Sequence, residues 1–184
     1  MTQAAYPAVF ETYRDERDRL KNWAHRHFVE EFDLPMGRLV DVACAEGFWA
    51  DVFVDFGYEA HAFDFLPLYI ENGRERYPRV EFKVADIYGE LPYEPESFDV
   101  VFVRGIPQFS YEDLSAMKEA IANLLPLSRG TTLLSFYSTQ DGVRSGVYGG
   151  KHYHHPHWTL RDAAEEVAPI KKWATVGNYL QVAL

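Results

Sequence analysis

Residues 38–49 read Arg-Leu-Val-Asp-Val-Ala-Cys-Ala-Glu-Gly-Phe-Trp, and they indicate the architecture of the chain. The apolar first half is typical of a strand that is buried on both faces of a parallel sheet. The small residues around Gly47 predict a tight turn, at which the backbone can come close to a ligand. A plain turn between a strand and a helix explains these small residues equally well, so this stretch alone does not assign a ligand.

The same alternation of extended and helical stretches continues along the chain. After a helix at residues 48–56, strands are expected at 59–65, 80–84, 98–103 and 131–137, with helices at 68–77 and 111–125. This order implies right-handed crossovers and a parallel sheet with helices on both faces. A helix at 160–167, capped by Thr159, precedes strands at 170–176 and 179–184, whose two-residue link allows only an antiparallel hairpin. The fold class is therefore α/β, with five parallel strands plus a C-terminal antiparallel hairpin.

The chain before residue 38 carries a helical pattern. Apolar residues between positions 9 and 32 recur at spacings that keep one stripe on a helix, and Pro35 and Gly37 end the pattern. The sequence shows no internal repeat, low-complexity tract or interdomain linker. Residues 1–184 are therefore expected to form a single domain, in which residues 1–34 make a helical cover.

Composition argues against several classes of partner. The 184 residues contain 28 Asp and Glu against 18 Lys and Arg, a net charge of -10 that works against binding to the phosphate backbone of nucleic acids. Aromatic residues reach 16%, a proportion that hints at a pocket for a flat ligand. The sequence has no apolar run long enough to span a bilayer and no signal-peptide pattern, and its single cysteine, Cys44, fits a reducing compartment. A cytoplasmic protein without a membrane partner is expected.

Acidic residues stand at the ends of the second and third predicted strands. Ligands of open parallel sheets bind outside the carboxyl ends of the strands, so these positions face the expected site. Asp64 is placed to hydrogen-bond ribose hydroxyls, and Asp86 to accept from an exocyclic amine while Ile87 packs against the ring. A helix cap or a solvated strand end explains each carboxylate alone. Together with the turn at Gly47, three consecutive strand ends suit a nucleoside, which makes a nucleoside-containing ligand the leading hypothesis.

From Arg38 to Leu184 the chain resembles the class I S-adenosylmethionine-dependent methyltransferases. The matching segments are Val40-Asp-Val-Ala-Cys-Ala-Glu-Gly47, Ala62-Phe-Asp-Phe65, Val84-Ala-Asp-Ile87 and Ser97-Phe-Asp-Val-Val-Phe-Val-Arg-Gly105. The C-terminal hairpin is also what that family adds to a Rossmann-like sheet. The resemblance implies the Rossmann-like methyltransferase fold, S-adenosyl-L-methionine as the cofactor, and methyl transfer as the activity.

The resemblance also implies roles for the residues of the site. The methionine part of the cofactor would be surrounded by Asp41, Ala43, Ala45 and Gly47. Asp64 would bind the ribose hydroxyls, and Asp86 and Ile87 the adenine, while Cys44, Phe65 and Arg104 complete the candidate cofactor residues. Where the family usually has Gly-x-Gly-x-Gly, this chain has alanine at the first two positions, and each added methyl group narrows the approach of a ligand.

The acceptor is expected beyond the fourth strand, where the resemblance places it. The candidate substrate residues are Tyr13, Arg104, Gln108, Tyr148, His152 and His154, with Tyr6 as further cover. The Asn-Pro-Pro-aromatic signature is missing, which disfavours an exocyclic amine on a base or a glutamine amide as the substrate. Arg104 either positions an anion or pairs with a neighbouring acid.

Residues 138–158, STQDGVRSGVYGGKHYHHPHW, form a basic island with four glycines and four of the seven histidines. Long glycine-bearing loops are frequently lids, so we expect a lid over a small-molecule acceptor, for which an anionic group would suit. Imidazoles titrate near neutral pH, which makes a histidine of this loop a possible general base. No residue has the sequence signature of a catalytic base, so the catalytic residue stays unknown, with His152, His154, His155 and Tyr111 as the candidates. We expect no metal. A zinc, nickel or copper site on His152, His154, His155 and His157 is the alternative, although an extended chain would point these rings to opposite sides in pairs.

The sequence thus favours methyl transfer from S-adenosyl-L-methionine to a small polar acceptor. A nicotinamide-dependent oxidoreductase would also use Asp64, but its Gly-x-Gly-x-x-Gly is not present here, and the C-terminal hairpin is foreign to it. The second alternative is a noncatalytic protein on the same fold that binds an adenosyl compound or a metal. That alternative is motivated by the two missing glycines and by the histidines.

Overall fold

The computed structural model describes residues 6–110, 113–135, 143–145, 151–153, 157–176 and 179–183. Its N-terminal part consists of α1 (Tyr6–Asp15), α2 (Arg17–Ala24) and the π-helical segment η1 (His25–Glu31). The prediction of one continuous helix over residues 9–32 is therefore wrong, because the chain leaves helical geometry at Glu16 and widens at His25. The wider turn keeps Ala24, Phe28 and Phe32, spaced four residues apart, on the buried face.

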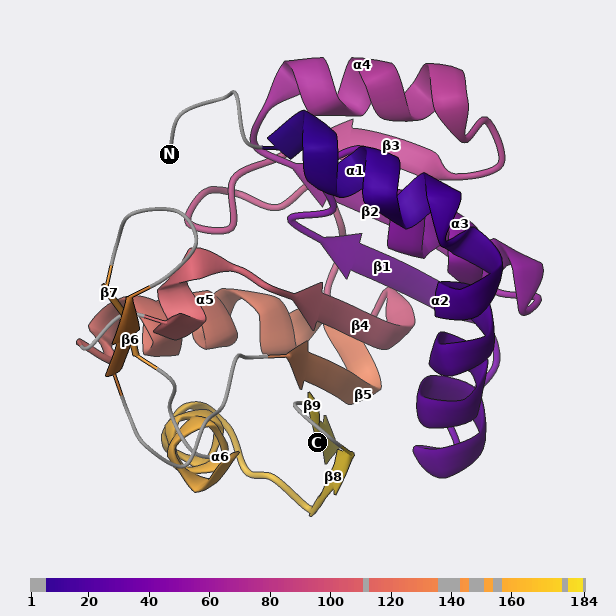
Figure 1. Cartoon of the computed structure of the whole chain (residues 1–184). Helices are drawn as coiled ribbons and strands as arrows, with labels where there is room; N and C mark the ends of the chain where they lie inside the picture. The colour runs from indigo at the N-terminus through magenta and orange to yellow at the C-terminus, as the bar shows by residue number, and fades with distance from the viewer. Residues whose placement is uncertain are drawn as a thin grey trace.

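The sheet has seven strands in the order β3-β2-β1-β4-β5-β9-β8 (Figure 1). Strands β1 to β5 run parallel, whereas β9 pairs antiparallel with β5 on one side and with β8 on the other. This arrangement confirms the predicted five parallel strands and C-terminal hairpin. The bounds of the strands are β1 (Arg38–Val42), β2 (Glu59–Asp64), β3 (Glu81–Val84), β4 (Phe98–Arg104), β5 (Ser128–Ser135), β8 (Lys172–Val176) and β9 (Tyr179–Ala183).

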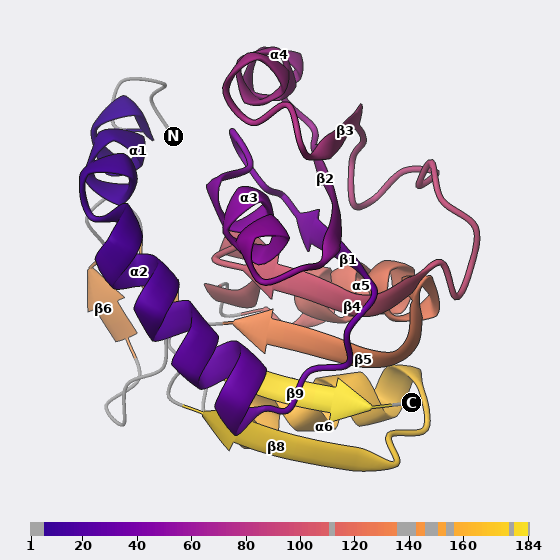
Figure 2. The same cartoon turned by 90° about the vertical axis from the view of Figure 1, so that its right-hand side faces the viewer.

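Helices cover both faces of the sheet, as Figure 2 shows, with α1 to α4 on one face and α5 and α6 on the other. The bounds of the helices are α3 (Phe48–Asp55), α4 (Pro67–Arg76), η2 (Pro107–Ser110), α5 (Ser115–Leu124), η3 (Leu125–Leu127) and α6 (His157–Val167). The last helix begins at His157, two residues before Thr159, so the prediction that Thr159 caps it is wrong. No helix in the described part of the chain is both long and apolar enough to cross a bilayer.

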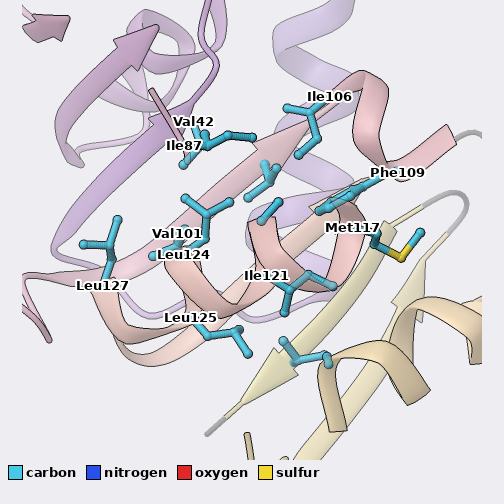
Figure 3. Packing of buried hydrophobic residues seen from close by; sticks show 14 of the residues in the cluster. Val42, Ile87, Val101, Ile106, Phe109, Met117, Ile121, Leu124, Leu125 and Leu127 are labelled. Atoms are coloured by element: carbon cyan, nitrogen blue, oxygen red, sulfur yellow. The ribbon is translucent and has the colours of Figure 1, made fainter. Parts of the chain in front are cut away.

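Each face of the sheet has its own hydrophobic core. Aromatic packing dominates the face of α2 to α4, where Phe28, Phe53 and Phe102 are fully buried and their ring centroids lie 5.1–5.9 Å apart. The opposite core is largely aliphatic and fills the space under α5 and α6, and it includes the fully buried Met117 and Ile121 (Figure 3). Because both faces are buried, the strands read as continuous apolar runs in the sequence.

A second, two-stranded antiparallel sheet, β6 (Val143–Ser145) and β7 (Lys151–Tyr153), lies within the segment that the sequence presents as a loop. Strand β7 contacts η2, the turn that follows β4. The described part of this segment thus lies near the carboxyl end of β4 (Figure 1).

Candidate functional site

The turn after β1 adopts a strained backbone. Ala43 and Ala45 have φ angles of 53° and 51°, and Gly47 has a φ of 83°. An alanine in this left-handed region costs roughly 1–2 kcal/mol, whereas glycine adopts it freely. The amide of Cys44 donates to the carbonyl of Phe63 at 3.0 Å, which ties the turn to β2. The turn therefore keeps the geometry that glycine favours, although two of its three positions are alanine.

The carboxylate of Asp64 joins the end of β2 to this turn. Its Oδ2 accepts from the amide of Ala45 and its Oδ1 from the amide of Leu66, both at 3.0 Å. The residue is 5% exposed, and burial raises the pKa of Asp64 even though backbone hydrogen bonds counteract the shift. A carboxylate has about four acceptor sites, of which the backbone amides of Ala45, Leu66 and Phe65 use three, so Asp64 can hold the turn and still accept a hydrogen bond from a ligand.

Asp41 lies beneath the turn, in β1, where burial raises its pKa to about 8. A hydrogen bond from the backbone of Ala50 and the charge of Arg104 oppose this shift without cancelling it. The Oδ2 atom is buried and has no hydrogen-bond partner in the described part of the chain. The folded protein therefore favours the protonated carboxyl at this position.

Asp41→Asn is expected to stabilise the protein increasingly as the pH rises. The folded-state pKa of about 8 exceeds the unfolded value of about 4, so the parent loses stability as the pH rises between these values. Asparagine does not ionise and retains an oxygen to accept from Ala50. Urea unfolding at several pH values should show a difference between variant and parent that grows up to about pH 8. A difference that does not depend on pH would contradict this account of Asp41.

Arg104, at the end of β4, is held between two aromatic rings. Its guanidinium carbon lies 4.6 Å from the centroid of Trp49 and 5.5 Å from that of Tyr13, and its Nη1 donates to the Tyr13 hydroxyl at 2.8 Å. The Tyr13 ring also packs against Phe48, with centroids 5.3 Å apart. Helix α1 is thereby fixed over the start of α3 and the end of β4.

Apolar side chains are exposed where β2 and β3 end. Phe65 is 61% exposed, and Val84 and Tyr88 are exposed as well. Asp86 is also exposed, and its Oδ1 accepts from the amide of Tyr88 at 3.0 Å. Ile87, in contrast, is buried in the aliphatic core. These strand ends thus offer an apolar surface with a carboxylate, the combination that a flat ring bearing an amine requires.

The sequence and the fold of this region resemble those of known proteins. Residues 39–126, which include the turn, Asp64, Asp86 and Arg104, match a family model described as a methyltransferase domain. This match covers 88 of the 184 residues, just under half of the chain. The chain is 28% identical over 96 residues to the demethylmenaquinone methyltransferase of Renibacterium salmoninarum. That match spans 52% of this chain and 38% of the length of the relative.

Solved methyltransferase structures share the fold of this domain. A 1,6-didemethyltoxoflavin-N1-methyltransferase of Burkholderia thailandensis, with bound 1,6-didemethyltoxoflavin and S-adenosylhomocysteine, superposes with a TM-score of 0.64 at 17% identity, covering 96% of this chain and 84% of that one. A magnesium protoporphyrin IX methyltransferase of Synechocystis PCC 6803 with bound S-adenosylmethionine gives 0.66 at 14% identity, covering 100% and 86%. The predicted Rossmann-like methyltransferase fold and family resemblance are confirmed.

The structure brings most of the predicted cofactor residues of the methyltransferase domain together. Ala43, Cys44, Ala45 and Gly47 form the turn, and Ala45 is bonded to Asp64. Burial raises the pKa of the Cys44 thiol, and the neighbouring carboxyl groups of Asp41 and Asp64, once ionised, raise it further. Tyr13 and Arg104 are also in contact, which the sequence did not predict.

Part of the predicted acceptor site lies outside the side chains that the structure describes. Tyr111, Tyr148, His154 and His155 lie outside the described residues, and His152 in β7 and His157 in α6 are described by their backbone alone. Gln108, in η2, is half-buried, and its Oε1 is enclosed without a hydrogen-bond partner in the described part of the chain. Among the described residues, no group of three or more His, Cys, Asp or Glu side chains could hold a metal ion.

Three residues next to the turn were missed by the sequence reasoning. Trp49 stacks on Arg104, and Tyr69 of α4 lies near Asp64 and Glu46, whose charges add to burial in raising the pKa of its hydroxyl. Glu46 accepts from the Nδ2 of Asn72 at 3.0 Å. Glu46 and Trp49 lie within two residues of Gly47 in the sequence. This closeness to the predicted turn could have identified them as site residues.

Proposed function

We propose that this chain transfers a methyl group from S-adenosyl-L-methionine to a small polar acceptor. The observation that carries the proposal is the hydrogen bond between the Asp64 carboxylate and the Ala45 amide, which unites the turn after β1 and the end of β2 in one polar site. The methyltransferase domain match and the similarity to a curated methyltransferase support an enzyme, and neighbours with bound S-adenosylmethionine or S-adenosylhomocysteine support this cofactor.

The residues present fit S-adenosyl-L-methionine. The acceptor site that remains on the Asp64 carboxylate suits a ribose hydroxyl, and the exposed ring of Phe65 with the Asp86 carboxylate suits adenine. The left-handed turn at residues 43–47 lets the backbone approach the methionine part. Arg104 carries a positive charge at the same edge of the sheet, where a carboxylate of the cofactor or of the acceptor can pair with it.

The cofactor supplies a sulfonium that already activates the methyl group, so the protein contributes mainly positioning and exclusion of water. Tyr13 and Trp49 hold the Arg104 guanidinium from two sides and fix its direction. Helix α1, which carries Tyr13, covers the start of α3 and shields this region from solvent. No step in this account requires a protein group to become covalently modified.

The acceptor is proposed to bind between η2 and the segment that contains β6 and β7. Contact between β7 and η2 supports this position, because η2 follows the strand that ends at Arg104. Gln108 in η2 and the histidines of residues 152–155 are the proposed acceptor-side groups, the latter on sequence grounds. The net charge of -10 supports a small molecule rather than nucleic acid, and the single cysteine supports a cytoplasmic location.

Asp86→Leu is expected to weaken S-adenosyl-L-methionine binding about tenfold or more, whereas Asp86→Asn should have a milder effect. The amide oxygen of asparagine can still accept from the adenine amine and from the Tyr88 amide, and leucine can do neither. Isothermal titration calorimetry measures both affinities. Glu90→Leu, which removes an exposed carboxylate four residues away, is the matched control and should bind like the parent. Equal losses in the two Asp86 variants would count against an adenine contact.

A further inference from the structure

A cleft of about 550 Å³ lies beside α3, and none of its lining residues belongs to the proposed cofactor or acceptor groups. In Figure 2, α1 and α2 flank α3 on one side and α4 lies on the other. Side chains from all four helices and from the turn after α4 line the cleft: Arg14, Arg17, Phe48, Asp51, Asp55, Arg76, Tyr77, Pro78 and Arg79.

The cleft is positively charged in an acidic protein. Four arginines and two aspartates line it, whereas the whole chain has 18 basic against 28 acidic residues. The excess of cations in a concave surface focuses a positive potential there. The cleft is thus suited to an anion, although the net charge of the chain is negative.

The inner arginines are fully paired and form the wall of the cleft. Arg17 contacts Asp51 at 2.7 Å and Asp55 at 3.0 Å, and Arg79 contacts the same two carboxylates at 2.8 and 2.9 Å. Burial alone would raise the pKa of Asp55, but hydrogen bonds from Lys21, Arg79 and Arg17 lower it to about 2. Asp55 therefore stays charged, and the ion pairs with Asp51 and Asp55 keep Arg17 and Arg79 occupied.

The outer arginines share one carboxylate. Nη1 of Arg14 and Nε of Arg76 lie 3.7 and 3.4 Å from the same Oε2 atom of Glu46, and the other Glu46 oxygen accepts from Asn72. Two guanidinium groups thus share one negative charge. Both N–O distances are longer than those of a short charge-assisted hydrogen bond. Both side chains are about one-third exposed, at 32% and 40%, so a solute can reach them.

We propose that this cleft binds a small phosphate-bearing anion between Arg14 and Arg76. The two guanidinium nitrogens lie within 3.7 Å of one oxygen atom, so a tetrahedral phosphate group is large enough to contact both. Guanidinium matches phosphate oxygens in a fork geometry that forms two parallel hydrogen bonds. The proposal does not depend on methyl transfer, because neither arginine belongs to the proposed cofactor or acceptor groups.

Isothermal titration calorimetry with inorganic phosphate, and with chloride at matched ionic strength, tests the site without S-adenosyl-L-methionine. Phosphate should bind and chloride should not. Arg14→Gln and Arg76→Gln should each weaken phosphate binding about tenfold, because each removes charge-assisted hydrogen bonds. Arg161→Gln is the matched control, since Arg161 pairs with Asp162 on α6 and lies outside the cleft. It should bind phosphate like the parent.

Glu46→Gln keeps the shape of the side chain and removes the competing charge, so it should tighten phosphate binding several-fold. A folding defect cannot mimic this gain. Absence of phosphate binding by the parent, or equal affinity in the Arg14, Arg76 and Arg161 variants, would overturn the proposal.

Phosphatidylcholine vesicles with and without phosphatidic acid test a lipid headgroup as the source of the phosphate. If the protein binds the acidic vesicles through Arg14 and Arg76 but does not bind free phosphate, the proposal is also overturned.

Discussion

Gly47→Ala is expected to destabilise the protein by about 3 kcal/mol. A Cβ atom at this position would lie 2.4 Å from Cε1 and Cζ of Phe82, a buried ring that cannot move without disturbing β3. The φ angle of 83° adds a backbone cost for any residue other than glycine. Urea unfolding of parent and variant measures the difference in free energy.

Gly130→Ala is the matched control for this prediction. Gly130 lies in β5 and has no atom within 4 Å of the position that a Cβ would take. This substitution should change the free energy of unfolding by less than about 1 kcal/mol. If the two alanine variants lose equal stability, the close packing of Gly47 against Phe82 is not what fixes the turn.

Asp64→Ala is expected to lower both ligand affinity and stability. Loss of the proposed hydrogen bonds to ribose should weaken S-adenosyl-L-methionine binding by roughly 1.5–3 kcal/mol, which is about ten- to a hundredfold. The amides of Ala45 and Leu66 also lose their acceptor, and each unsatisfied amide costs about 1–3 kcal/mol if it stays buried. Calorimetric titration measures the affinity, and urea unfolding measures the stability.

Asp64→Asn separates the two effects. The amides of Ala45 and Leu66 bind different oxygens of Asp64, and asparagine keeps only one of these oxygens, so its stability should fall between those of the parent and of Asp64→Ala. Unchanged affinity in both variants would rule out Asp64 as the ribose-binding residue. Unchanged stability in both would show that the two backbone hydrogen bonds do not hold the turn.

Much of the sheet can be predicted from the sequence because its central strands are buried on both faces. The run at residues 38–42 and the two-residue link at 177–178 leave few alternatives for a parallel strand and an antiparallel hairpin. The N-terminal helix was predicted less well, because hydrophobic spacing reports the buried face and not a change of helical pitch. Ala24, Phe28 and Phe32 keep that face through the π-helical turn.

Those residues of the candidate site that directly follow a strand in the sequence could be predicted. The turn at residues 43–47 and Asp64 each follow a strand, so their place at the carboxyl edge follows from the topology. The contact of Tyr13 with Arg104, 91 positions apart, depends on how α1 packs across the sheet. The stability role of Asp64 was also missed, because the sequence indicates a ligand contact and not the amides that its carboxylate holds.

Calorimetric titration of the parent protein with S-adenosyl-L-methionine and with S-adenosylhomocysteine tests the central claim most directly. We expect both ligands to bind at one molecule per chain and to raise the unfolding temperature, because the groups proposed to contact the turn, Asp64 and Asp86 are shared by the two ligands. If neither ligand produces binding heat or raises the unfolding temperature, the proposed cofactor site and the methyl-transfer function are both wrong.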